Sequence, residues 1–154
     1  GAPKYFLSWS NNLTWRNFDL SVFFRGTFGF DVFNMRKYGM GLQGCGTDNV
    51  LRSAYLEDKN IRTGGGVISS YFLEDGSFIK LENVTLGYNF TPKNRKLLDN
   101  MRIYLSAKNL FTLTGYSGND PSIIDVNGIQ PGVDSNSAYP TATQLSLGVT
   151  LRFK

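Results

Sequence analysis

The sequence has 154 residues, enough for one domain, and combines 17 glycines, eight tyrosines and twelve phenylalanines with no histidine. Charged residues make up 18% of the chain, below the roughly 25% of an average globular domain, and no apolar run approaches the ~18 residues of a membrane helix. The net charge of +4 forms no basic patch interleaved with aromatic residues, which argues against nucleic acid as a partner.

Alternation of apolar and polar side chains predicts an all-β chain of five strands. We expect these strands at Tyr5–Trp15, Phe18–Phe28, Phe78–Phe90, Met101–Phe111 and Thr143–Lys154. In the third strand the apolar positions change from odd to even numbers near Glu82-Asn83, which predicts a β-bulge there. The last strand has the clearest pattern, with Leu145 to Phe153 alternating with polar residues or glycine.

The connections between these strands are alternately short and long. Arg16-Asn17 and Thr91–Asn100 are short, whereas Gly29–Ser77 and Thr112–Ala142 are long. In an antiparallel meander, alternate connections lie at the same end of the sheet. Both long loops are therefore expected at one end and both short turns at the other.

The strand length and the aromatic residues favour a membrane environment for the apolar face. Strands of about eleven residues, tilted near 45°, cross about 25 Å of hydrocarbon. Aromatic rings would then form two rows, one at each membrane–water interface, where amphipathic aromatic residues are favoured. These rings are Trp15, Phe18, Phe90 and Phe153 at the short-turn end, and Tyr5, Phe28 and Phe111 at the long-loop end. A soluble β-sandwich would also bury alternate residues, but it does not explain the two rows.

Five strands cannot close a transmembrane barrel, and an open edge in lipid leaves backbone groups unpaired. The opening stretch "GAPKYFLSWSNNLTW" enters a strand almost at once and has no signal peptide. We therefore expect the chain to be a segment of a longer barrel or to complete a barrel formed by other polypeptide.

Four stretches resemble one family. "NFDLSVFFRGTFGFDVFN", "YFLEDGSFIKLENVTLGYNF", "MRIYLSAKNLFTLTGYSGNDPSI" and "YPTATQLSLGVTLRFK" are similar, in order and spacing, to the C-terminal end of SusC-like (RagA-like) TonB-dependent transporters. The resemblance implies that residues 1–154 form the last five strands of a 22-stranded transmembrane β-barrel, without its plug. It further implies an outer-membrane location in a Gram-negative bacterium, extracellular long loops, and uptake of glycans or peptides.

The same resemblance implies the partners. They are the remaining barrel strands and plug, outer-membrane lipid, a SusD-like surface lipoprotein that acts as a lid, and TonB, contacted through an N-terminal segment that this chain lacks. Two alternatives remain open at this stage. One is a secreted glycan-binding β-sandwich, and the other is a passive porin, which would have no plug.

Aromatic side chains in the long loops are the candidate contacts to substrate or lid, because rings stack on sugars and peptides. The candidates are Tyr38, Tyr55, Tyr71, Phe72, Tyr116 and Tyr139, together with the carboxylate of Asp120. The simpler interpretation of any one of these rings is that it packs the loops together.

The sequence indicates no enzyme and no cofactor. "GMGLQGCG" matches a dinucleotide-binding pattern but lacks the surrounding βαβ unit, so we interpret it as a glycine-rich loop. Cys45 has no partner for a disulfide or a metal site, and no histidine is present to activate it. Asp120, Asp125 and Asn127 could supply oxygen ligands to calcium, although turn chemistry explains the same stretch.

Overall fold

The structure is a computed structural model, and it describes residues 2–42, 49–56, 68–92, 98–122, 132–135, 139 and 141–153. The chain divides into two compact units. The sheet unit comprises Phe6–Gly26, Ile79–Leu113 and Ala142–Lys154. The loop unit comprises Gly1–Tyr5, Thr27–Phe78 and Thr114–Thr141. Among the described residues, no helix combines the length and the apolar character needed to cross a membrane.

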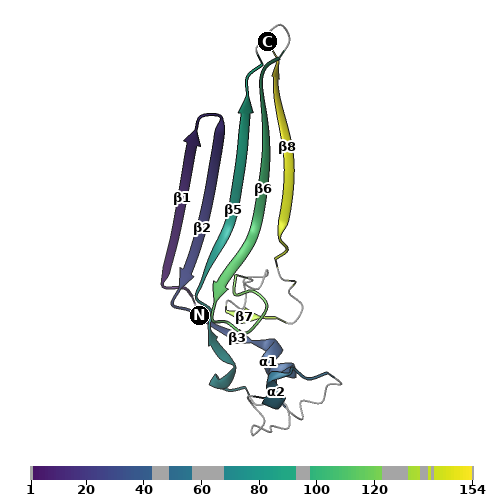
Figure 1. The fold of residues 1–154 in the computed structure, drawn as a ribbon. Helices are drawn as coiled ribbons and strands as arrows, with labels where there is room; N and C mark the ends of the chain where they lie inside the picture. Colours follow the sequence, from purple (N-terminus) through teal and green to yellow (C-terminus); the bar gives the residue numbers. More distant parts are fainter. Residues whose placement is uncertain are drawn as a thin grey trace. The chain divides into compact units, whose positions relative to one another are not determined.

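A single five-stranded sheet forms the sheet unit, and neighbouring strands run in opposite directions (Figure 1). Its order is β1-β2-β5-β6-β8. The strands are β1 (Tyr5–Trp15), β2 (Phe18–Phe28), β5 (Phe78–Phe90), β6 (Leu98–Thr114) and β8 (Gln144–Phe153). All five predicted strands are therefore confirmed, and β6 extends beyond the predicted bounds at both ends.

The pairing of β6 with β8 keeps like residues opposite one another. Leu105 faces Leu147 across the ladder, and the next pair along joins Ser106 to Ser146. Because side chains alternate between the two faces of a strand, this register places apolar pairs on one face and polar pairs on the other. The ladder ends at Lys108, beside Asn109, which has φ +52°. Asparagine is one of the few residues that tolerate this conformation.

The apolar face of the sheet is left open. Leu147 keeps 75% of its surface exposed and Leu105 keeps 51%. In β5 the exposed apolar side chains change from odd-numbered Ile79 to even-numbered Leu86, so the predicted change of parity is present. A β-sandwich would bury this face under a second sheet, whereas among the described residues no second layer covers it.

The loop unit is ordered around a small sheet of three strands, in the order β4-β3-β7. The strand β3 pairs antiparallel with β4 and parallel with β7. The elements are β3 (Asp31–Asn34), α1 (Met35–Met40), α2 (Ser53–Leu56), the 3-10 helix η1 (Ser70–Phe72), β4 (Leu73–Asp75) and β7 (Val133–Asp134). These elements lie within the two long connections, Gly29–Ser77 and Thr112–Ala142.

The buried core of the loop unit joins segments that are distant in the sequence. Phe30, Val32, Phe78 and Tyr116 form one buried cluster. Gly76 lies against two of them, because an added Cβ would stand 2.5 Å from both the Phe30 ring and a Val32 methyl group. Any side chain at position 76 would therefore disturb this core.

Candidate functional site

The polar face of the sheet unit carries a hydrogen-bonded cluster that spans three strands. Asp19 on β2 accepts hydrogen bonds from Arg102 Nη2 at 2.5 Å, from Arg102 Nε at 3.1 Å and from Asn89 Nδ2 at 2.8 Å. Gly87 on β5 makes room for the carboxylate, since a Cβ there would lie 2.5 Å from both of its oxygens. Asp19 and Arg102 on this face are therefore paired with each other.

Further along the same face, smaller polar groups continue this pattern. Thr85 Oγ1 donates to Ser106 Oγ at 3.1 Å, and Ser106 Oγ lies 3.3 Å from Asn83 Oδ1, to which it donates. The ring of Tyr104 lies over Gly148, so a side chain at position 148 would require the ring to move. A face of paired charges, hydroxyl groups and glycine is suited to contact with water, and these contacts indicate a structural wall.

Aromatic rings meet on the opposite face, near the first tight turn. The Phe18 ring lies 6.5 Å from that of Trp15 and 4.8 Å from that of Tyr88, measured between centroids. Trp15 and Phe18 are thus neighbours, as the predicted aromatic row requires. On β5 the ring that touches Phe18 belongs to Tyr88, which the sequence analysis had not included in the row.

Three of the predicted contact residues are buried in the loop unit. Tyr116, only 6% exposed, donates from its hydroxyl to Asp134 Oδ2 at 2.6 Å. Burial, followed by this bond to a carboxylate, raises the pKa of Tyr116. Phe72 is also buried, and the buried Asp120 carboxylate accepts hydrogen bonds from Ser122. In this structure these three side chains hold the loop unit together.

The other predicted rings differ in exposure. Tyr38 and Tyr71 are half-buried, and their ring centroids lie 5.3 Å and 5.2 Å from that of Phe72. Tyr55 is 60% exposed and Tyr139 is 92% exposed. Of the seven predicted residues, these last two present the most surface to an external molecule.

The predicted glycine motif and the calcium candidate fall largely outside the described residues. The stretch from Gln43 to Asp48 includes Cys45 and is not described, and neither are Asp125 and Asn127. Among the residues that are described, no group of three or more histidine, cysteine, aspartate or glutamate side chains could hold a metal ion.

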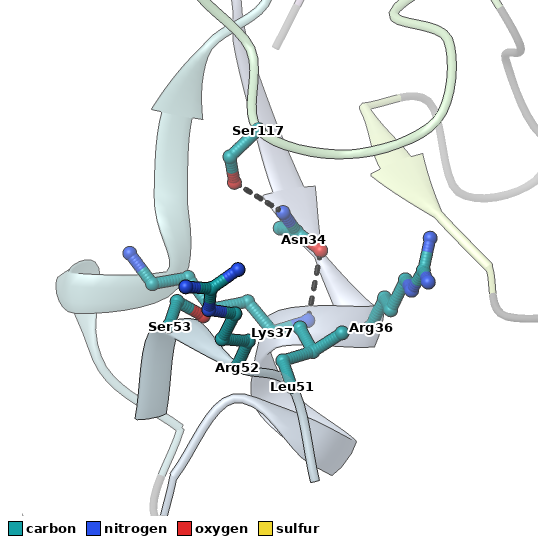
Figure 2. A pocket seen from close by; sticks show the side chains of 7 residues that line it. All are labelled: Asn34, Arg36, Lys37, Leu51, Arg52, Ser53 and Ser117. Atoms are coloured by element: carbon teal, nitrogen blue, oxygen red, sulfur yellow. Dashed lines mark hydrogen bonds between the residues drawn. The ribbon is translucent and has the colours of Figure 1, made fainter. Parts of the chain in front are cut away.

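The loop unit contains a pocket that no motif or periodicity in the sequence predicts. Its volume is about 340 Å³, and Figure 2 shows its lining. The lining residues are Asn34, Arg36, Lys37, Leu51, Arg52, Ser53 and Ser117. Asn34 organises one wall, because its Oδ1 accepts from Lys37 N at 2.9 Å and caps α1, while its Nδ2 donates to Ser117 Oγ at 3.1 Å.

The pocket carries an excess of positive charge. Among its three cations, Lys37 is the one with an ion pair to a described residue, its Nζ lying 3.5 Å from Glu74 Oε1. Burial opposes ionisation of Glu74, but hydrogen bonds from Ser117 and the nearby lysine outweigh it and lower the pKa of the carboxyl group. Arg36 Nη1 donates to a neutral amide oxygen, Asn119 Oδ1. Within the described part of the chain, Arg52 forms no ion pair.

Comparison with known proteins identifies the class of protein. No family model matches the sequence. TonB-dependent receptor P3 of Formosa agariphila is 26% identical over 173 residues, a match covering 99% of this chain and 16% of that protein. TonB-dependent receptor SusC of Bacteroides thetaiotaomicron is 28% identical over 161 residues, covering 99% of this chain and 15% of that protein.

Solved structures with a similar fold are also of transport proteins. The RagAB peptide importer in its "closed-closed" state matches with a TM-score of 0.77 and 25% identity, over 97% of this chain and 17% of that one. A second structure, of the RagAB peptide transporter, matches with a TM-score of 0.76 and 25% identity over the same shares. The chain thus spans about one sixth of the length of the proteins it matches.

The fold and these matches show that the chain is similar, over nearly its whole length, to a segment of TonB-dependent receptors, which are outer-membrane proteins. More narrowly, the chain is SusC-like, since SusC matches nearly all of it and the RagAB structures share its fold. The resemblance recognised in the sequence is therefore confirmed. The relatives are receptors and importers and not enzymes, in line with the non-catalytic role that the sequence indicates.

Proposed function

We propose that the chain forms part of the barrel wall and the outer loops of a TonB-dependent transporter that imports peptides or glycans. The observation that carries this proposal is the open apolar face of the sheet, opposite a polar face of paired charges and hydroxyl groups. Lipid would cover the first face and water the second, as in a transmembrane barrel. The similarity to SusC and to the RagAB peptide importer supports the same role.

The similarity to SusC-like transporters supports a place for the chain at the C-terminal end of the barrel. Residues 1–154 would be the last five strands of a 22-stranded barrel, with the plug and the other strands supplied by the rest of the protein. The strands β1 and β8 are the edges of the sheet. In lipid their free backbone groups need partners, so β1 would pair with a preceding strand and β8 with the first strand of the barrel.

The loop unit would then lie outside the cell, because the long loops of these barrels are external. Its exposed rings, Tyr55 and Tyr139, are the best placed of the predicted residues to touch substrate or a SusD-like lipoprotein lid. TonB would bind elsewhere on the whole protein. No cofactor is needed for this role, and calcium in the loops remains a prediction of the sequence.

Uptake measurements test this function. A strain that lacks the gene should accumulate less of a labelled peptide mixture or of a labelled oligosaccharide mixture than the parent strain. Collapse of the proton-motive force, or loss of TonB, should abolish the same uptake. Uptake that survives both treatments would indicate a passive porin. A protein recovered in soluble form without detergent would instead support the secreted sandwich.

A further inference from the structure

We propose that the pocket formed by Asn34, Arg36, Lys37, Arg52 and Ser53 in the loop unit binds an anionic group, such as a carboxylate or a sulfate, on an external molecule. The existence of this site does not depend on transport. Its use in selecting substrates rests on the proposed function, in which the molecule would be a peptide or glycan that carries such a group.

Uncompensated charge is the first argument for an anion. Three cations, Arg36, Lys37 and Arg52, line the pocket, and among the described residues the carboxylate paired with any of them is that of Glu74. One negative charge beside three positive charges leaves an excess of two. Because Glu74 already has Ser117 and Lys37 as partners, it is committed to the wall of the pocket. An anion entering the pocket would meet attraction from the two arginines.

Unused hydrogen-bond donors are the second argument. A guanidinium carries five N–H groups in a planar fork that matches the two oxygens of a carboxylate or sulfate. Arg36 uses Nη1 for Asn119, and its other donors have no partner among the residues that the structure describes. Arg52 is exposed. The next residue, Ser53, also lines the pocket and adds a hydroxyl group as a further donor. Bonds between charged partners are about twice as strong as those between neutral ones.

The third argument is the space that these groups surround. Figure 2 shows the side chains of Lys37 and Arg52 extending to one side of the pocket and that of Arg36 extending to the other. The volume of about 340 Å³ lies at the lower end of the roughly 300–1,000 Å³ of small-molecule sites. One charged residue of a peptide, or one acidic sugar unit, is therefore a suitable occupant.

The lysine is held in place independently of any ligand. Its Nζ lies 4.4 Å from the centroid of the Tyr71 ring and 3.5 Å from Glu74 Oε1, while its backbone N–H donates to Asn34. A preorganised cation loses little conformational entropy when an anion binds. Tyr71 was predicted from the sequence as a substrate contact, and here it would act by positioning Lys37.

Arginine modification tests the site without any need to identify the natural ligand. The full-length protein would be treated with phenylglyoxal, and modification of each arginine followed by mass spectrometry of its peptides. Sodium acetate supplies a carboxylate and sodium sulfate a dianion, with sodium chloride at equal ionic strength as the reference. At about four times its Kd, a bound anion should slow modification of Arg52 about fivefold. Arg16, in the tight turn of the sheet unit, is the internal control and should not be protected.

Two outcomes of this experiment are decisive. Protection of Arg52 beyond that of Arg16 supports the site, and comparison of acetate with sulfate shows which group it prefers. Equal rates at both arginines in every salt would overturn the proposal, whatever the uptake measurements show. Unchanged uptake in the strain that lacks the gene, with Arg52 still protected in the purified protein, would instead contradict the proposed function and leave the anion site intact.

A pair of variants links the site to substrate choice. Arg52→Gln removes one pocket charge, and Lys4→Gln removes one charge from an exposed position of the same loop unit outside the pocket lining. For a peptide with a free C-terminal carboxylate, Arg52→Gln should weaken binding about tenfold or more relative to the amidated peptide. Lys4→Gln should leave that ratio unchanged. Equal effects of both variants would mean a general charge effect and would overturn a specific site.

Discussion

An arginine placed at two adjacent positions of β8 distinguishes a lipid-facing surface from a packed core. Leu147 lies on the apolar face, 75% exposed and opposite Leu105, whereas Ser146 lies on the polar face, opposite Ser106. Near the middle of the bilayer, an arginine facing lipid costs about 2–4 kcal/mol. Leu147→Arg should therefore lower the folding equilibrium constant about 30- to 700-fold.

Ser146→Arg provides the matched control, because it adds the same side chain on the polar face. Its guanidinium would reach water beside hydroxyl groups, so the expected change is below about 1 kcal/mol. Both variants of the full-length protein would be compared by urea unfolding in lipid vesicles and by the fraction assembled in the outer membrane. Equal and large damage from both would show that both faces are buried, which would refute the assignment of the apolar face to lipid.

Two further predictions concern the loop unit. Tyr116→Phe removes the donor to the buried Asp134 carboxylate and should destabilise the unit by about 1–3 kcal/mol, seen as faster amide exchange, while Tyr139→Phe should have no effect. Because the pKa of Glu74 in the folded protein lies below its ordinary value of 4.5, its contribution to stability is present above about pH 4.5 and is lost as the pH falls through the folded value. Susceptibility to pepsin should rise over that range, and Glu74→Gln, which keeps the contact to Ser117 but not the charge, should lack this response.

The sheet could be predicted from the sequence because its strands follow a local rule. A period of two residues assigns each side chain to a face, and this assignment agrees with the pairing of Leu105 with Leu147. The turn at Arg16 could also be predicted, since the strand before it ends in Trp15 and the strand after it begins with Phe18. Asn109, with its φ of +52°, was missed because nothing in the alternation marks the end of the β6–β8 ladder.

The loop unit could not be predicted in the same way, because its order depends on contacts between distant residues. Asn34 hydrogen-bonds to Ser117, a partner 83 positions away, and the short strands β3, β4 and β7 have no periodic pattern of their own. The basic pocket was overlooked for the same reason. Its only local signal is the pair Arg36-Lys37, in the first turn of the helix that Asn34 caps, and Arg52 joins them only once the chain has folded.

Burial also separates residues that look equivalent in the sequence. Tyr116 and Tyr139 are both loop tyrosines, yet one is 6% exposed and the other 92%. The buried cluster with Phe30 and Phe78, together with the bond to Asp134, makes the first a structural residue. The type of ring alone therefore could not distinguish a tyrosine that is buried in the loop unit from one that is exposed.

The central claim is that the odd-numbered residues of β8 face lipid and the even-numbered ones face water. Spin labels on single cysteines from Leu145 to Val149, introduced after Cys45→Ser in the full-length protein, test it directly in membrane vesicles. Collision with oxygen, which partitions into lipid, should be highest at 145, 147 and 149. Collision with a water-soluble nickel chelate should be highest at 146 and 148. Low collision with both reagents at every position would mean a packed protein core on each side, and would contradict the account.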